Sequence, residues 1–244
     1  MAKLGGTMDG ATLPRSPSSS VGDYLKAIRE SAEEGAASTK DVADRLSVSQ
    51  ASVTNMFARL REMGLVEYER YHGASLTEAG LSEALRLVRR HRLIETFLLD
   101  QLGYSWEEVH EEAEKLEHVV SDRFTQRLAD LLGHPDHDPH GEPIPAVDGT
   151  LEPDESFPLP AAAAGERVLI ARVGDETTGL LSYLGERGLV PGRLLTVEEV
   201  RTLDGVIAVA DEDGATHTLG APLAGALFVR SAPRTADSRG TSRF

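Results

Sequence analysis

Imidazole and carboxylate side chains gather at helical spacing in one short stretch of the sequence, residues 106–118. Four of them follow at i, i+4, i+7 and i+8 and would share one face of a helix: His110, Glu114, Glu117 and His118. Ser105 with Glu108 three residues later is the capping-box pattern that starts such a helix. Upstream, His91 and Glu95 form an i, i+4 pair in a second helical segment. Two helices that each present imidazole and carboxylate could enclose a divalent cation.

A solvated acidic helix face with incidental histidines would show the same residues, and an isolated pattern of this kind is more often that than a site. The chain has no cysteine, so thiolate metal sites, disulfides and cysteine nucleophiles are excluded. Any metal would therefore be held by nitrogen and oxygen. Three further histidines, His134, His137 and His140, fall in a proline-broken stretch for which we predict no fixed ligand geometry.

Charge is distributed unevenly along the 244 residues. Of the net charge of −15, residues 81–150 contribute −8, with 15 acidic against 7 basic side chains, whereas residues 1–80 are close to neutral. A locally basic face that meets nucleic acid is therefore compatible with the first part of the chain. No apolar run approaches the length of a membrane span and the N-terminus lacks a signal-sequence pattern. We expect a cytoplasmic protein without a membrane partner.

Residues 20–77 follow the order helix, helix, tight turn, helix and hairpin, which is typical of a winged helix-turn-helix. The third helix begins with short polar side chains suited to base edges and phosphates, and basic residues flank it. The candidate DNA-binding residues are Lys40, Ser49, Gln50, Ala51, Ser52, Thr54, Asn55, Arg59 and Arg70. Arg70, Tyr71 and His72 occupy the hairpin tip, where a backbone or minor-groove contact would be made. A small three-helix domain without a nucleic-acid role is one alternative, and a winged-helix protein that binds only protein partners is another.

Residues 78–133 form the helical segment that contains the candidate ligands. We predict a long helix from Glu78 to about Leu102, then a second that runs from Trp106 through to Leu131. Their apolar content exceeds what two such helices bury between themselves, which predicts a dimerisation surface. A two-fold dimer also suits a winged-helix protein that reads paired half-sites.

The remaining segments differ in periodicity. Residues 134–165 are rich in proline and acid and are predicted to be a linker. In residues 166–231 the period becomes two, which predicts five short strands in a small, partly open barrel. Residues 1–19 and 232–244 are predicted to be flexible tails.

With these parts in this order, the chain resembles the diphtheria-toxin-repressor family of metal-dependent transcriptional regulators in its three-domain form. The likeness covers about residues 20–230, and its most specific part is H-R-L-I-E (91–95) followed by W-E-E-V-H-E-E-A-E-K-L-E-H-V (106–119), with D-Y-L at 23–25. L-G-E-R-G-L-V-P-G in the last segment looks like the SH3-like domain of the iron-responsive branch. The implied fold is mainly α with a small all-β C-terminal domain: winged helix-turn-helix, helical dimerisation domain and SH3-like barrel.

The resemblance implies two metal ions per subunit. One site would use Asp23, Glu114, Glu117 and His118. A second would use His91, Glu95 and His110, with Asp175 or Glu176 of the barrel as a further candidate ligand.

The type of metal depends on positions 23 and 114. Iron regulators of the family commonly have Met and Cys there, and manganese regulators have Asp and Glu, as in Asp23 and Glu114. Carboxylate in place of sulfur favours harder ions, so Mn(II) is the expected co-effector and Fe(II) the alternative. Lys26 stands where the manganese branch usually has a second carboxylate, which favours two separated sites over a close two-metal cluster.

The expected function is therefore a metal-dependent repressor of metal-homeostasis genes that binds double-stranded operator DNA as a homodimer and has no small-molecule substrate. A cation shared between the DNA-binding and dimerisation domains would tie them together and neutralise clustered carboxylates. A metal-dependent hydrolytic enzyme is the alternative from another class. The sequence offers no distinct nucleophile or phosphate-binding glycine loop for it, so we predict that the protein is not an enzyme.

Overall fold

The computed structural model describes residues 19–32, 35–174, 178–201 and 203–232. The chain divides into two compact units, residues 1–84 and 85–244. Helix α4 (Glu78–Leu102) begins in the first unit and continues in the second. No helix in the described part of the chain is long and apolar enough to cross a membrane.

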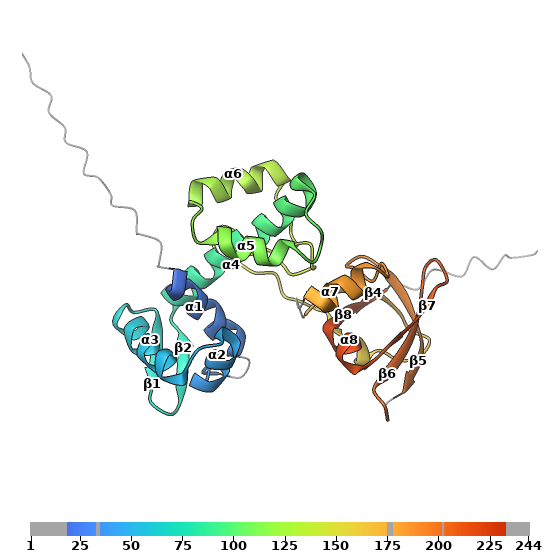
Figure 1. The fold of residues 1–244 in the computed structure, drawn as a ribbon, viewed down its shortest axis with the longest axis horizontal. Helices are drawn as coiled ribbons and strands as arrows, with labels where there is room; N and C mark the ends of the chain where they lie inside the picture. The colour runs from blue at the N-terminus through green and yellow to red at the C-terminus, as the bar shows by residue number, and fades with distance from the viewer. Residues whose placement is uncertain (1–18, 33–34, 175–177, 202, 233–244) are drawn as a thin grey trace, which may run out of the picture. The chain divides into compact units, whose positions relative to one another are not determined.

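The first unit is three helices and a hairpin, which confirms the predicted winged helix-turn-helix (Figure 1). Its elements are α1 (Ser19–Ser31), α2 (Thr39–Leu46), α3 (Gln50–Glu62), β1 (Val66–Glu69) and β2 (Gly73–Leu76). Ser38 and Ser49 cap α2 and α3, because their side chains accept from the main-chain N–H of Asp41 and Ser52. The three helices bury a shared core that includes Leu25, Ile28, Val53, Phe57 and Leu60.

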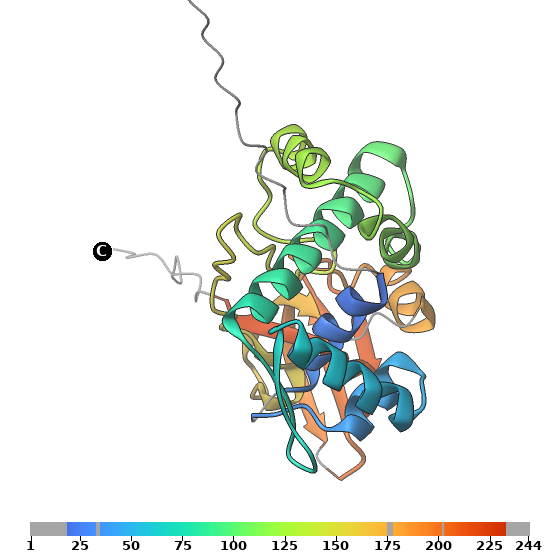
Figure 2. The same ribbon diagram turned by 90° about the vertical axis from the view of Figure 1, so that its left-hand side faces the viewer.

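The hairpin of β1 and β2 extends from these helices (Figure 2), and its second strand is hydrogen-bonded to the segment that precedes α2. Ala74 exchanges two main-chain hydrogen bonds with Ala37, of 2.8 and 3.0 Å. Gly73 has a φ of +95°, and a side chain there would meet the Ala37 carbonyl oxygen at 2.5 Å. At the tip, Tyr71 also has a positive φ, of 73°, and is 89% exposed.

The helical part of the second unit consists of α4, α5 (Val109–Glu117) and α6 (Asp122–Leu132). The prediction of one helix from Trp106 to Leu131 was wrong. Helix α5 ends at Glu117, and the Ser121 side chain accepts from the Phe124 N–H, at 3.2 Å, to begin α6. A serine cap competes with helix continuation, and the apolar periodicity on either side of it does not reveal the break.

Residues 134–148 pack against α4, although the sequence predicts a linker there. Arg92 of α4 donates to Glu142 at 3.0 Å, and Arg89 donates to the carbonyl oxygen of Pro145 at 2.7 Å. Ile144 is buried with the core of the helices. We call residues 134–148 the strap. Ion pairs between residues some 50 positions apart hold it, and no local sequence pattern shows them.

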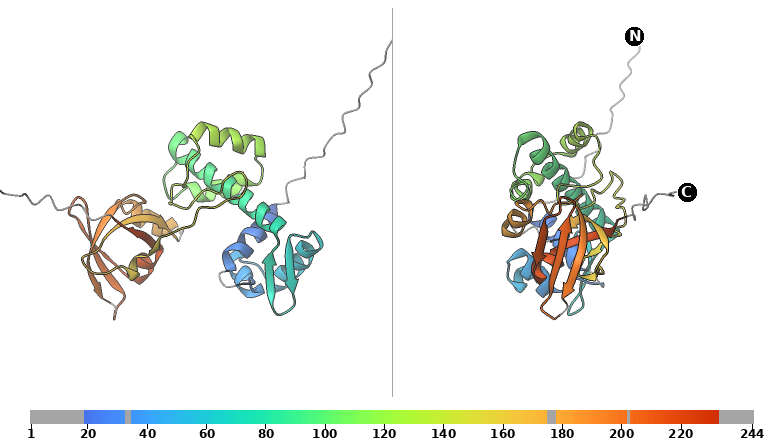
Figure 3. Two further views of the ribbon diagram at one scale, coloured as in Figure 1. Left: turned by 180° about the vertical axis from the view of Figure 1, so that it is seen from behind. Right: turned by 90° about the vertical axis from the view of Figure 1, so that its right-hand side faces the viewer.

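The β part is one six-stranded antiparallel sheet of order β3-β8-β4-β5-β6-β7. Most of it is drawn in orange and red in Figure 3. Its elements are β3 (Phe157–Pro158), β4 (Arg167–Val173), α7 (Thr178–Gly185), β5 (Leu194–Arg201), β6 (Val206–Asp211), β7 (Thr216–Leu219), α8 (Ala221–Ala226) and β8 (Leu227–Ser231). The five predicted strands are present, and β3 with the buried Leu159 adds a part that was predicted to be linker. Val168, Ile170, Leu195 and Val209 lie in its core.

Candidate metal centre

Helices α4 and α5 present the predicted ligands of the second unit to one another. His91 and Glu95 lie one turn apart on α4, and His110, Glu114 and Glu117 lie along α5 with His118 at its C-cap. Apolar side chains of both helices, among them Leu98 and Ala113, share one buried cluster. This packing brings together residues that are 15 to 27 positions apart in the sequence.

His91 is the centre of this group. Its Nε2 lies 2.9 Å from Glu95 Oε1 and 3.2 Å from His110 Nδ1, and His110 Nδ1 lies 3.1 Å from the same Glu95 oxygen. On its other side, His91 Nδ1 lies 2.5 Å from Glu117 Oε2 and 3.8 Å from Glu114 Oε1. The His91 imidazole therefore lies between the carboxylates of Glu95 and Glu117. His110 lies on the Glu95 side and Glu114 lies on the Glu117 side.

Glu95 and Glu117 are fully buried carboxylates. Burial raises the pKa of Glu95, but the positive charge of His91 and hydrogen bonds with His110 and His91 outweigh it and hold that pKa well below its usual range. A buried carboxylate kept ionised needs compensating positive charge, which a proton on imidazole or a bound cation can supply.

Three predicted ligands of the first site, Glu114, Glu117 and His118, offer atoms that lie within 4.8 Å of one another. Glu114 and His118 are partly exposed, so this cluster opens toward solvent. Asp23 lies partly buried on α1 in the first unit. The other three ligands belong to the second unit, so the role of Asp23 as a metal ligand stays a prediction from the resemblance. Asp175, with Glu176, lies outside the described residues.

A second cluster joins Glu95 to the strap, and sequence reasoning missed it. Glu95, Asp138 and His140 are all buried, and each offers a ligand atom within 4.8 Å of the others. His140 Nε2 lies 3.0 Å from the main-chain oxygen of Trp106, and a carbonyl only accepts, so Nε2 carries the hydrogen. In the neutral imidazole the Nδ1 lone pair then lies 3.9 Å from Glu95 Oε1.

Neither His140 Nδ1 nor Glu95 Oε2 has a hydrogen-bond partner among the described residues, and both atoms are buried. Buried acceptor atoms that lack a donor cost free energy. A divalent cation between nitrogen and carboxylate oxygen would remove that cost. The residues at this place therefore fit a metal ion.

The strap holds His140 rigidly, in contrast to the predicted absence of fixed geometry. Asp138 accepts from the N–H of His140 and of Glu142 at 2.8 and 3.0 Å, and Trp106 Nε1 donates to the Pro139 carbonyl at 2.9 Å. The D-P-H-G sequence is a turn signature that could have indicated this order. His134, by contrast, is exposed beside Asp130.

The predicted DNA-binding residues are all exposed in the first unit. Ser49 and Ser52 are engaged at the start of α3, and Thr54 Oγ1 donates to the Gln50 carbonyl at 2.9 Å. Gln50, Ala51 and Asn55 are exposed along the same helix. In a complex with DNA, Gln50 and Asn55 would therefore be the residues to read base edges, and the capping hydroxyls would suit phosphate contacts.

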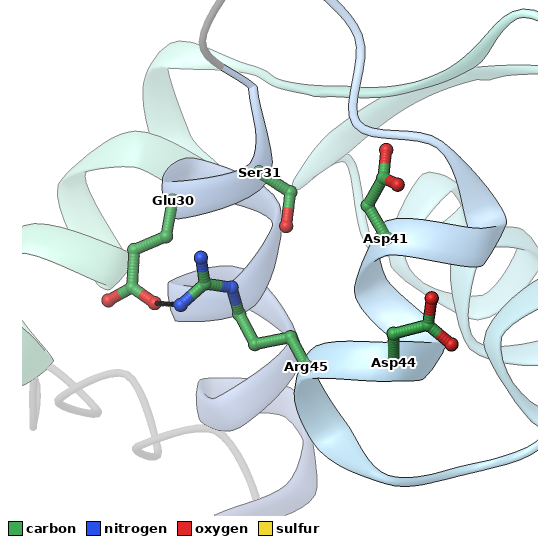
Figure 4. A pocket seen from close by; sticks show the side chains of 5 residues that line it. All are labelled: Glu30, Ser31, Asp41, Asp44 and Arg45. Atoms are coloured by element: carbon green, nitrogen blue, oxygen red, sulfur yellow. Dashed lines mark hydrogen bonds and ion pairs between the residues drawn. The ribbon is translucent and has the colours of Figure 1, made fainter. Parts of the chain in front are cut away.

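A surface pocket of the first unit lies between α1 and α2 (Figure 4). It is lined by Glu30, Ser31, Asp41, Asp44 and Arg45. Arg45 donates to Glu30 at 3.0 Å across it. The residues that line this pocket include an ion pair but no histidine, whereas each cluster of the second unit contains histidine.

Three consecutive family models match the chain. They are the N-terminal DNA binding domain of iron dependent repressors over residues 18–74, their metal binding and dimerisation domain over residues 77–146, and the FeoA domain over residues 157–231. These matches define a metal-dependent, DNA-binding regulator of transcription with three domains.

Individual relatives agree. The iron-dependent repressor IdeR of Mycobacterium tuberculosis is 32% identical over 191 residues, which cover 72% of this chain and 82% of that protein. The diphtheria toxin repressor of Corynebacterium efficiens is 33% identical over 178 residues, 67% of this chain and 77% of that protein. The chain belongs to the iron-dependent repressor family of metal-dependent transcriptional repressors.

Solved structures of metal-bound proteins have a similar fold. A manganese-dependent transcriptional repressor in complex with manganese has a TM-score of 0.81 and 42% identity and covers 87% of this chain and 100% of that chain. ScaR with bound Zn²⁺ has a TM-score of 0.75 and 35% identity over 87% of this chain and 99% of that chain.

Proposed function

We propose that this protein is a transcriptional repressor whose effector is Mn(II), and that the loaded homodimer binds operator DNA. The observation that carries the proposal is the donor set around His91. Every candidate ligand supplies carboxylate oxygen or imidazole nitrogen, because the chain has no cysteine. Such a set suits Mn(II) or Fe(II), and the carboxylate at position 114 favours the harder ion. A neighbour that was solved in complex with manganese supports the same choice.

We propose two ions per subunit. The first is bound by Glu114, Glu117 and His118, with Asp23 as the ligand from the DNA-binding domain. The second is bound at Glu95 with Asp138 and His140 of the strap. This second set differs from the predicted one. It keeps Glu95 as a ligand, whereas His91 and His110, which contact Glu95 Oε1, orient that carboxylate.

Metal control of DNA binding follows from the negative charges of the carboxylates that these ligands bring together. When bound, the cation neutralises carboxylates that otherwise repel one another. Glu114, Glu117 and His118 belong to the dimerisation domain, and Asp23 belongs to the winged helix, so shared ligation would fix one domain on the other. Metal then favours the arrangement in which the two α3 helices of a dimer match paired half-sites. The two arrangements are the one that matches the half-sites and the one that does not. Metal can shift the equilibrium between them only by as much as its affinity for the two differs.

The proposal is tested by DNA titration. A binding sequence is selected from random DNA with the Mn(II)-loaded protein, and its affinity is then measured by fluorescence anisotropy in Mn(II), anaerobic Fe(II), Mg(II) or chelator at one ionic strength. We expect Mn(II) to tighten binding by roughly 10-fold or more, within the usual range of allosteric coupling. Equal affinity in chelator would refute metal control, and stimulation by Fe(II) but not Mn(II) would assign iron as the effector.

A further inference from the structure

The corner between α5 and α6 is joined to α4 by one buried arginine. Arg90 precedes His91 on α4, and its side chain is 8% exposed. Its Nη1 donates to the main-chain oxygen of Glu117 and its Nη2 donates to Asp122 Oδ1, both at 2.9 Å. Arg86, one turn earlier, also pairs with Asp122. A single guanidinium thus contacts the last residue of α5 and the first residue of α6.

Both contacts suit the helix ends that they meet. The Glu117 carbonyl is among the last four of α5, which have no partner within the helix, and a cation is favoured at that end. Asp122 is the first residue of α6, where a negative side chain is favoured. The rigid, forked guanidinium can join two such groups at a fixed angle, which a lysine ammonium cannot do equally well.

The corner also carries two proposed metal ligands. Arg90 holds the main chain of Glu117, while the side chain of Glu117 reaches His91 Nδ1 at 2.5 Å. Two adjacent residues of α4 therefore fix the same glutamate, one at its backbone and one at its carboxylate. His118 follows directly at the C-cap, so its position depends on the same backbone.

We infer that Arg90 is a positioning residue for the first metal site: it sets the backbone from which Glu117 and His118 reach the ion. This inference rests on the proposed function. Positioning of the ligands by Arg90 strengthens metal binding. The charge of Arg90 has the opposite effect, because a nearby positive group weakens the binding of a cation. Asp122 offsets that charge by a direct ion pair. Removal of the guanidinium should therefore weaken metal binding if positioning dominates and strengthen it if charge dominates, so the sign of the change decides.

The test measures Mn(II) binding by calorimetry on the full-length protein and its Arg90→Met and Arg90→Lys variants. The two sites are told apart with Glu114→Ala, which retains the second site only. We expect Arg90→Met to weaken the first site by roughly 10- to 100-fold, as loss of a residue that orients ligands does. The second site should keep its affinity, and Arg90→Lys should fall between. Arg89→Met is the matched control, because this neighbouring arginine contacts the strap at Pro145 and no ligand of the first site.

Unchanged or tighter first-site binding in a folded Arg90→Met protein would overturn the inference. Where that variant does not fold, Arg90→Lys keeps the positive charge but loses the forked guanidinium, and unchanged first-site affinity there would overturn the inference equally. Absence of Mn(II) binding by the unaltered protein would refute the proposed function together with the inference. Normal binding by the unaltered protein with no effect in these variants would refute the inference alone.

Discussion

Replacement of His140 by phenylalanine removes a buried imidazole but keeps an aromatic ring beside Trp106, whose ring centroid lies 5.1 Å away. The metal-free variant loses one hydrogen bond to the Trp106 carbonyl, which costs about 1–2 kcal/mol because that carbonyl is left unpaired. The larger effect is on the metal increment, which is the free energy of unfolding that bound metal adds. A site at a free metal concentration of about 100 times its Kd adds about 2.7 kcal/mol to the free energy of unfolding, and His140→Phe should lose that amount.

The assay is chemical denaturation of both proteins with Mn(II) and with chelator. The difference between the two conditions isolates the metal increment from the change in metal-free stability. His134→Ala is the control, since His134 is an exposed histidine at the start of the same strap. Two ions bound by His140→Phe with the full increment would refute the site at Glu95, Asp138 and His140. The second ion would then belong to His91, Glu95 and His110 alone.

Three further predictions concern the first site, the wing and the barrel. Glu114→Ala should abolish Mn(II)-stimulated DNA binding while sedimentation still reports a dimer, and Glu111→Ala on the same helix should not; unaltered metal dependence would exclude Glu114 as a ligand. Tyr71→Asn should raise the free energy of unfolding by up to about 1 kcal/mol, because asparagine tolerates the positive φ better. The same change should weaken DNA binding, since it removes an exposed aromatic ring at the hairpin tip, and unchanged affinity would remove Tyr71 from the interface. In the β part, burial raises the pKa of Asp154, but hydrogen bonds from Ser156 and Arg172 lower it to about 2. Its stabilising contribution is therefore present above the unfolded pKa, near 3.8, and is lost as the pH falls toward 2. Asp154→Asn should accordingly flatten the acid-unfolding profile between pH 4 and 2, and an unchanged profile would contradict the assignment.

Local chemistry made much of the fold predictable. Ser38 and Ser49 cap α2 and α3 through main-chain N–H groups only three residues further along, so these helix starts depend on local sequence alone. The strands of the barrel follow their period of two for the same local reason. His91, Glu95 and His110 were also brought together as their helical spacing and the resemblance suggested.

Contacts between distant residues explain what the sequence did not reveal. His140 approaches Glu95 from 45 positions away, and the strap that carries it is held by Arg92 through Glu142. Proline and acidic residues in that stretch have the composition of a linker, and only the buried partners make it rigid. Asp23 is a different case, because its role depends on how the winged helix and the dimerisation domain meet in the metal-loaded protein.

Anomalous diffraction at the manganese edge, from crystals of the Mn(II)-loaded protein, tests the central claim most directly. It locates each ion and identifies its ligands at the same time. We predict one ion among Asp23, Glu114, Glu117 and His118, shared between the two domains, and a second at Glu95, Asp138 and His140. An ion bound without Asp23, or no manganese at Glu114 and Glu117, would contradict the account of how metal controls the DNA-binding domain.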